Sequence, residues 1–336
     1  MMTSPTASRR TILAAIAALP LAGCAARAVH GTDAGGVERL DPALDRIIPR
    51  TAHVETIATG YRWAEGPVWN ARDGSLLFSD VPANVIHRWV PGEGARPWLD
   101  PSGLAGPIPA EIREAGANGL AIDRAGSLVM GDSGSRTVAR LDMATRAKTV
   151  LADRFEGKRF NSPNDVALAH GGAIYFTDPP YGLAGGDASP VKELAFNGVY
   201  RLASDGAVTL IDDGLSFPNG IALSPDERTL YVSISDPERP ELLAYPLDAA
   251  GRAGTPRRLF DFRAGVAAKQ PGLPDGMTVD ARGTLFATGP GGVHVLTPDG
   301  RLLGRIATGV AIANCAIGAG YLYLASSDRI ARIALA

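Results

Sequence analysis

The sequence has few cysteines and no excess of charge of either sign. Its 336 residues include only Cys24 and Cys315, and 33 Lys and Arg stand against 35 Asp and Glu. A scaffold of several disulfide bonds is therefore excluded, so the hydrophobic core and any bound metal must stabilise the fold. The missing basic excess also argues against a nucleic-acid-binding protein, because such proteins need positive charge for the phosphates.

Long hydrophobic runs are scarce as well. The run "ILAAIAALPLAG", which begins at Ile12, is too short to span a bilayer. It follows Arg9 and Arg10 and ends in "LAGC", which is typical of a twin-arginine signal ending at a lipobox cysteine. We therefore expect residues 1–24 to direct export to the periplasm, with a lipid on Cys24 anchoring the protein to a membrane. An ordinary secretory signal with an incidental cysteine is the alternative.

The next segment, residues 25–50, is expected to be a linker. It contains one short helical turn, because Asp41 suits the N-cap and Pro42 the first helical position. Residues 1–23 hold two Arg and no acid, so a chain beginning at Cys24 has 31 basic and 35 acidic residues, a net charge of −4. Residues 51–336 remain for the main domain.

One hairpin pattern recurs six times along this domain. The copy "PNGIALSPDERTLYVSIS", from Pro218, has a polar residue, a Gly, an apolar strand, a turn and a second strand. Other short β segments, such as "VIHRWV" and "GVYRLAS", lie between the copies. The polar residues at the start of the copies are Glu65, Asn118, Asn164, Asn219, Asp275 and Asn314.

Four strands in each repeat of roughly 50 residues, repeated six times, predict an all-β fold, the six-bladed β-propeller. The 40 Gly and 25 Pro agree with many turns. The alternative is a β-sandwich with coincidental hairpins. We expect "TAHVETIA", from Thr51, to supply a strand that joins the last blade to the first.

Radial symmetry would place the six polar residues in a ring at one mouth of the central channel. Asn and Asp at such positions can be simple turn formers, and we favour this for Asn118 and Asn314. Glu65 is a poor turn former, and Asp275 would meet it across the mouth. Two facing carboxylates repel each other unless a cation or a proton lies between them. Oxygen ligands favour Ca²⁺ or Mg²⁺, then Mn²⁺, with Zn²⁺ less suited.

The ordered motifs "AEGPVW", "RFNSPNDV", "IYFTDPPYG", "PNGIALSPDERTLYVS" and "PDGMTVDARGTLF" resemble the SMP-30/gluconolactonase/luciferin-regenerating family, and most of all its bacterial gluconolactonases. The resemblance covers residues 55–336 and implies a six-bladed propeller that hydrolyses sugar lactones with one divalent metal. It implies that Glu65, Asn219 and Asp275 bind the metal, that Asp275 also transfers protons, and that Asn164 faces the substrate. The family's substrate-binding Arg has no secure match, and Arg159 is the nearest candidate.

Several alternatives stay open. A related esterase or lactonase with another substrate, or a non-catalytic propeller that binds a ligand or protein, would share this fold. His294 is either a base near the site or, as we favour, a histidine packed between blades. Three segments interrupt the repeat, from Pro97, Tyr181 and Phe262, and we expect the first and third to cover the channel mouth.

Overall fold

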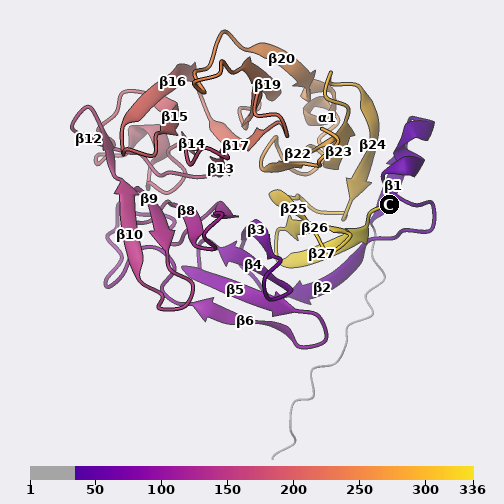
Figure 1. Cartoon of the computed structure of the whole chain (residues 1–336), viewed down its shortest axis with the longest axis horizontal. Coiled ribbons are helices and arrows are strands. Elements are labelled where there is room, and N and C mark those ends of the chain that lie inside the picture. The colour runs from indigo at the N-terminus through magenta and orange to yellow at the C-terminus, as the bar shows by residue number, and fades with distance from the viewer. Residues whose placement is uncertain (1–34) are drawn as a thin grey trace, which may run out of the picture. The chain divides into compact units, whose positions relative to one another are not determined.

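The structure is a computed structural model that describes residues 35–336. The predicted signal of residues 1–24, with Cys24, lies outside the described residues, as does the first part of the expected linker. Residues 35–336 form the predicted β-propeller, with six blades arranged around a central axis (Figure 1). Within these residues, no helix is long and apolar enough to cross a membrane.

Each blade is an antiparallel sheet whose strands follow one another from the axis outward. The strands of blades 1 to 3 are β3 (Ala64–Asn70), β4 (Ser75–Asp80), β5 (Val85–Val90), β6 (Gly94–Leu99), β7 (Leu120–Ile122), β8 (Leu128–Asp132), β9 (Thr137–Leu141), β10 (Lys148–Ala152), β13 (Val166–Leu168), β14 (Ile174–Asp178), β15 (Asn197–Leu202) and β16 (Val208–Leu215). The strands of blades 4 to 6 are β17 (Pro218–Leu223), β18 (Thr229–Ile234), β19 (Glu241–Pro246), β20 (Arg257–Asp261), β21 (Met277–Val279), β22 (Leu285–Gly289), β23 (Gly292–Leu296), β24 (Leu302–Ala307), β25 (Asn314–Gly318), β26 (Tyr321–Ser326) and β27 (Arg329–Ala334). The remaining elements are the strands β1 (Gly36–Arg39), β2 (Glu55–Thr59), β11 (Arg154–Phe155) and β12 (Lys158–Arg159), and the short helices η1 (Pro42–Arg46), η2 (Gly186–Ala188) and α1 (Arg263–Ala267).

The core lies between neighbouring blades. Because each blade packs on both faces, strand β4 is buried at all six of its positions and shows no alternation of polar and apolar residues. Phe78 and Trp89 of blade 1, for example, pack with Tyr323 of blade 6. Burying each such side chain contributes about 1.5–3 kcal/mol.

The ring closes between the two ends of the domain. Strand β2 pairs with β27, and Arg332 Nε donates to Glu55 Oε2 at 2.8 Å. This confirms that the segment after residue 50 joins the last blade to the first. Strand β2 thus completes the four-stranded sheet of blade 6, and the chain then continues into blade 1.

Residues 36–48 differ from the expected linker, because they pack onto the propeller. Strand β1 pairs with β24 as a fifth strand of blade 5, and Leu44 and Ile48 are fully buried. The predicted helical turn is confirmed as η1, with Asp41 Oδ1 accepting from the Ala43 backbone N–H at 2.8 Å. The propeller therefore begins before residue 51.

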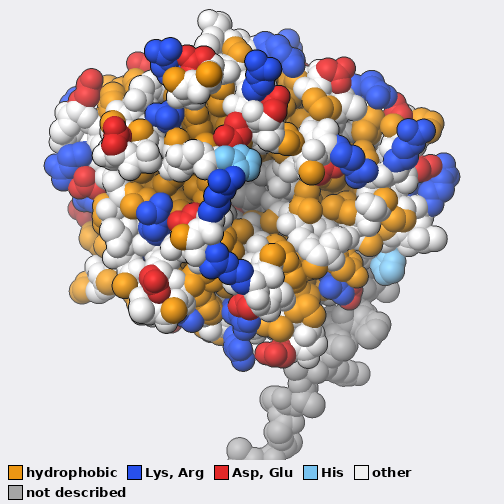
Figure 2. Space-filling model, in the orientation of Figure 1, with side chains coloured by type: hydrophobic (Ala, Val, Ile, Leu, Met, Phe, Trp, Pro, Cys, Tyr) orange, Lys and Arg blue, Asp and Glu red, His pale blue; other side chains and the backbone are white. Residues whose placement is uncertain are grey.

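The innermost strand of every blade lines a central channel, as the symmetry predicted. Strands β3, β7, β13, β17, β21 and β25 together surround a cavity of about 330 Å³. The centre of the face seen in Figure 2 is hollowed, and basic and acidic side chains are interspersed around it. This visible face therefore shows no large region of one sign.

Candidate active site

Close packing of the blades fixes the ring of polar residues. A Cβ atom added at Gly220 would lie 2.6 Å from Gly276 Cα, so the backbone after Asn219 abuts the next ring residue, Asp275. Hydroxyl groups on the second strands reinforce this contact, since Ser233 Oγ donates to the Asp275 carbonyl at 2.6 Å. Thr177 Oγ1 donates to the Asn219 carbonyl in the same way, also at 2.6 Å. The recurrent Gly and the Ser or Thr at strand ends thus position the ring.

A cavity of about 490 Å³ opens beside this ring. It contains five of the six ring residues, namely Glu65, Asn118, Asn164, Asn219 and Asp275. Its other lining residues are Trp63, Arg113, Glu114, Tyr181, Ser235, Gly272, Leu273, Ala311, Ile312 and Ala313. Apolar walls with a few converging polar groups are typical of small-molecule sites.

Two carboxylates dominate the electrostatics of this cavity. Glu65 accepts from Gly66 N at 3.1 Å and from Trp63 Nε1 at 3.4 Å. Burial raises the pKa of Glu65, and the charges of Asp165 and Glu114 raise it further. Burial also raises the pKa of Asp275 well above its usual range, and the charge of Glu65 adds to this effect. Neither carboxylate forms an ion pair within residues 35–336, so their repulsion is not neutralised by the chain itself.

Asn219 presents an oxygen to the same cavity. Its Nδ2 donates to Ser235 Oγ at 2.9 Å, and Ser235 in turn donates to the Pro274 carbonyl. Because the amide nitrogen is occupied, the Oδ1 atom remains available as an acceptor or a metal ligand. Asn164 lines the cavity too, which is compatible with contact to a substrate.

Asp165 is a buried acid that sequence reasoning missed. It accepts from Val166 N at 2.9 Å and from Ile221 N at 3.2 Å, and it lies at the channel below the ring. Burial raises the pKa of Asp165 to about 7. A signal was present, because Asp165 stands where four of the six copies have Gly.

No group of three or more His, Cys, Asp and Glu side chains that could hold a metal occurs within residues 35–336. The predicted ligand set nevertheless fits a hard cation. It consists of two carboxylates, on Glu65 and Asp275, and one free amide oxygen, on Asn219. Such oxygen donors suit Ca²⁺ and Mg²⁺ better than Zn²⁺.

The two remaining ring residues, Asn118 and Asn314, behave differently from each other. Asn314 lines the channel, where its Oδ1 accepts from its neighbour Cys315 N at 2.8 Å and its side chain also hydrogen-bonds to Asp165. Asn118 lines the cavity, where its side chain forms no such bond to its own turn. Asn314 therefore makes a local bond compatible with a turn former, whereas Asn118 does not.

Two other candidates lie outside the cavity. Arg159 donates from Nη2 to the Ser135 carbonyl at 2.7 Å and does not contribute to the lining, so this geometry gives no support to its expected contact with the substrate. Arg113 is the arginine that lines the cavity instead. His294 packs against the rings of Phe260 and Phe262, and burial together with Arg305 lowers its pKa to about 4. His294 is thus a packed histidine, as we favoured.

The interrupting segments do reach the cavity. Arg113 and Glu114 belong to the segment from Pro97, and Gly272 and Leu273 belong to the one from Phe262. The segment from Tyr181 contributes Tyr181 itself, whose ring stacks on Phe217 at 6.0 Å. All three segments therefore line the candidate site.

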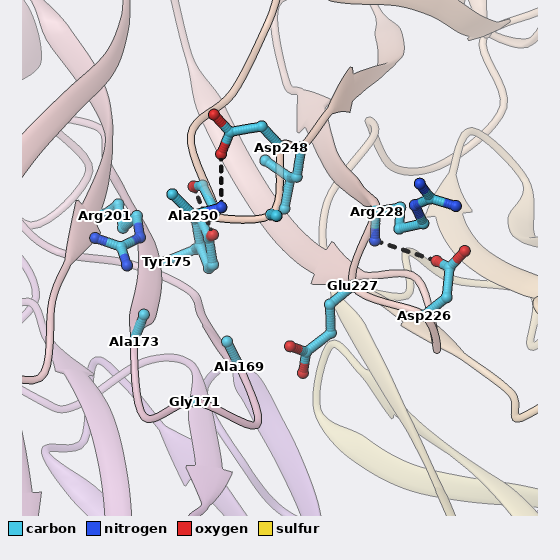
Figure 3. Close-up of a pocket in the computed structure, with 13 residues that line it drawn as sticks. Ala169, Gly171, Ala173, Tyr175, Arg201, Asp226, Glu227, Arg228, Asp248 and Ala250 are labelled. Atoms are coloured by element: carbon cyan, nitrogen blue, oxygen red, sulfur yellow. Dashed lines mark hydrogen bonds between the residues drawn. The ribbon is translucent and has the colours of Figure 1, made fainter.

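A second hollow of about 370 Å³ lies at the other ends of the strands, between blades 3 and 4 (Figure 3). Two of its acids are held by their own turns, since Asp226 accepts from Arg228 N at 3.1 Å and Asp248 accepts from Ala250 N at 2.9 Å. The third, Glu227, accepts from His170 N at 2.6 Å. Tyr175 donates to the Gly251 carbonyl at 2.8 Å. This hollow brings no free carboxylates together, so the ring cavity is the better candidate.

Comparison with known proteins agrees with the motifs. The family model of the SMP-30/Gluconolactonase/LRE-like region matches residues 63–328. A gluconolactonase of Zymomonas mobilis is 42% identical over 99% of this chain and 98% of its own length. Pentonolactonase XacC of Haloferax volcanii is 30% identical over 74% of this chain and 75% of its own length. The solved structure of XC5397, a gluconolactonase from Xanthomonas campestris, superposes with a TM-score of 0.77 at 32% identity, covering 89% of this chain and 95% of that one. The protein therefore belongs to the SMP-30/gluconolactonase/LRE-like family.

Proposed function

We propose that this protein is a metal-dependent lactonase that opens a sugar lactone, such as glucono-1,5-lactone, at the mouth of the propeller channel. The observation that carries the proposal is the convergence of Glu65 and Asp275 without a basic partner among the described residues. The high identity to a gluconolactonase over nearly the whole chain supports the same activity.

Glu65, Asn219 and Asp275 would hold one divalent cation. Their oxygen atoms favour Ca²⁺, with Mg²⁺, Mn²⁺ and Zn²⁺ as alternatives. When bound, the cation supplies Lewis-acid polarisation of the lactone carbonyl and offsets the repulsion between the two carboxylates.

The side chains account for the proton transfers. Asp275 takes a proton from a water molecule as the water oxygen bonds to the carbonyl carbon of the lactone. The bond between that carbon and the ring oxygen then breaks, and Asp275 returns the proton to the ring oxygen. The product is the open-chain hydroxy acid. Asn164 would hold a hydroxyl group of the substrate in the cavity.

The test is hydrolysis of glucono-1,5-lactone, followed by proton release, after chelation and after re-addition of Ca²⁺, Mg²⁺, Mn²⁺ or Zn²⁺ in turn. Turnover that depends on a cation supports the proposal. If no cation gives turnover, a different lactone or ester, or a non-catalytic binding propeller, becomes the better account.

We also propose that the protein is an exported lipoprotein of the periplasm, on the pattern of residues 1–24 alone. The Cys24→Ala variant should move from the membrane fraction to the soluble fraction of cells. An unchanged distribution would contradict the proposed anchor.

A further inference from the structure

Two of the segments that interrupt the repeat are bonded to each other over the candidate site. Ile112 and Leu183 form an isolated antiparallel bridge. Around it, Arg113 N donates to the Gly182 carbonyl at 2.8 Å, and Ala184 N donates to the Glu111 carbonyl at 2.8 Å. The segment from Pro97 is thus held by the segment from Tyr181, which fixes the backbone of the residues that follow Ile112.

This bridge places Glu114 in the wall of the cavity. Its backbone N–H also points to the Gly182 carbonyl, at 3.3 Å, and its side chain is about one-fifth exposed. The negative charge of Glu114 raises the pKa of Asp275, Glu65 and Tyr181. The Glu114 carboxylate therefore lies close to the acidic ring residues that line the same cavity. It is nevertheless not part of a three-carboxylate cluster that could hold a metal.

Arg113 orients this carboxylate and counteracts the effect of its burial. Arg113 Nη2 donates to Glu114 Oε1 at 2.9 Å. Burial raises the pKa of Glu114, whereas the charge and the hydrogen bond of Arg113 lower it. The second oxygen, Oε2, takes part in no hydrogen bond within residues 35–336. In its ionised form, an oriented carboxylate with one free oxygen can only accept hydrogen bonds, so its natural partner is a hydroxyl group.

We propose that Glu114 is a specificity-determining residue, which Arg113 positions to accept a hydrogen bond from a hydroxyl group of a polyhydroxylated lactone. Trp63, which is about one-third exposed in the same cavity, offers an apolar face for the ring of such a substrate. The inference rests on the lactonase function and names the residue pair that would recognise the hydroxyl groups of the substrate. A lactone without hydroxyl groups would leave the Glu114 carboxylate unpaired.

The test compares glucono-1,5-lactone with δ-valerolactone, which has the same ring size but no hydroxyl groups. The variants are Glu114→Gln and Glu114→Ala, with Glu111→Gln as the matched control on the same segment, where the side chain is exposed. The ratio of the two kcat/KM values should fall about fivefold to tenfold in Glu114→Gln and about 10- to 100-fold in Glu114→Ala, mainly through KM for the sugar lactone. Arg113→Gln should show part of this loss, Arg113→Lys should restore some of it, and Glu111→Gln should match the wild type.

Three results would overturn the inference. Equal losses on both lactones would indicate an electrostatic or structural role for Glu114, and an unchanged KM for glucono-1,5-lactone would exclude the hydroxyl contact. A wild-type protein that opens δ-valerolactone as well as it opens the sugar lactone would refute the specificity and leave the lactonase function standing. A wild-type protein that opens neither lactone with any cation would remove the proposed function itself.

Discussion

Replacing Gly220 by Ala tests whether the ring depends on the close approach of neighbouring blades. The added Cβ would lie 2.6 Å from Gly276 Cα and 2.9 Å from the Asp275 carbonyl carbon, and closer still to the Asp275 carbonyl oxygen. Ordinary contacts of this kind measure 3.4–4 Å, so one backbone must move by about 1 Å. The atoms in the way belong to backbone, which cannot rotate aside as a long side chain would.

The expected cost follows from overpacking. Such insertions destabilise a fold by about 1–3 kcal/mol, and Gly→Ala recovers only about 0.4–1 kcal/mol through the unfolded chain. The difference is a net loss of about 1.3 kcal/mol, which should lower Tm by about 3–5 °C. The rate of lactone hydrolysis should fall even at temperatures where the variant is fully folded, because the displaced backbone belongs to Asp275.

The assay is thermal unfolding followed by circular dichroism, together with hydrolysis of glucono-1,5-lactone. Gly171→Ala is the matched control, because a Cβ at Gly171 meets no atom within 4 Å. It should leave both Tm and activity close to the wild type. A Gly220→Ala variant as stable and active as Gly171→Ala would refute the reasoning.

Three further predictions concern Asp275 in the site, Arg159 outside it, and the pH dependence of thermal stability. Asp275→Asn should lower kcat about 100-fold or more while the protein stays folded, and near-normal turnover would remove Asp275 from the mechanism. Arg159→Ala should change KM for the lactone less than about twofold, because its guanidinium bonds to the Ser135 carbonyl, and a large rise in KM would return Arg159 to the site. In the chelated protein, the raised pKa values of Glu65 and Asp275 mean that the folded state binds protons more tightly than the unfolded chain. Tm should therefore fall as pH rises from about 5 to about 8, and Ca²⁺ should remove that dependence, whereas an equal pH profile with and without Ca²⁺ would contradict the site.

The repeat made the blade order and the ring predictable from sequence. Each ring residue precedes a local hairpin, so its position depends on contacts between residues close in the chain. The approach of Glu65 and Asp275 followed from symmetry, because equivalent positions in successive blades meet around one axis. The histidine at position 294 was also placed correctly, since a strand residue flanked by apolar neighbours is usually buried.

Contacts between distant segments could not be predicted in this way. Strand β1 pairs with β24, so that Gly36 lies opposite Ala307, and nothing local to residues 25–50 marks that partner. Arg113 and Glu114 reach the cavity through a bridge between two irregular segments, which follow no repeat. The nearness of Arg159 to Asn164 in sequence predicts that it reaches the substrate, yet Arg159 lies in the β11–β12 hairpin and does not line the cavity.

The most direct test of the account is to count cations bound to the chelated protein while its lactonase activity returns. Wild-type protein should bind one Ca²⁺ per chain at the ring, and hydrolysis of glucono-1,5-lactone should rise in proportion to the bound ion. The Glu65→Gln variant should bind the ion much more weakly and should need more Ca²⁺ for the same activity. Full hydrolysis by protein shown to be free of metal would contradict the central claim that Glu65, Asn219 and Asp275 form a catalytic metal site.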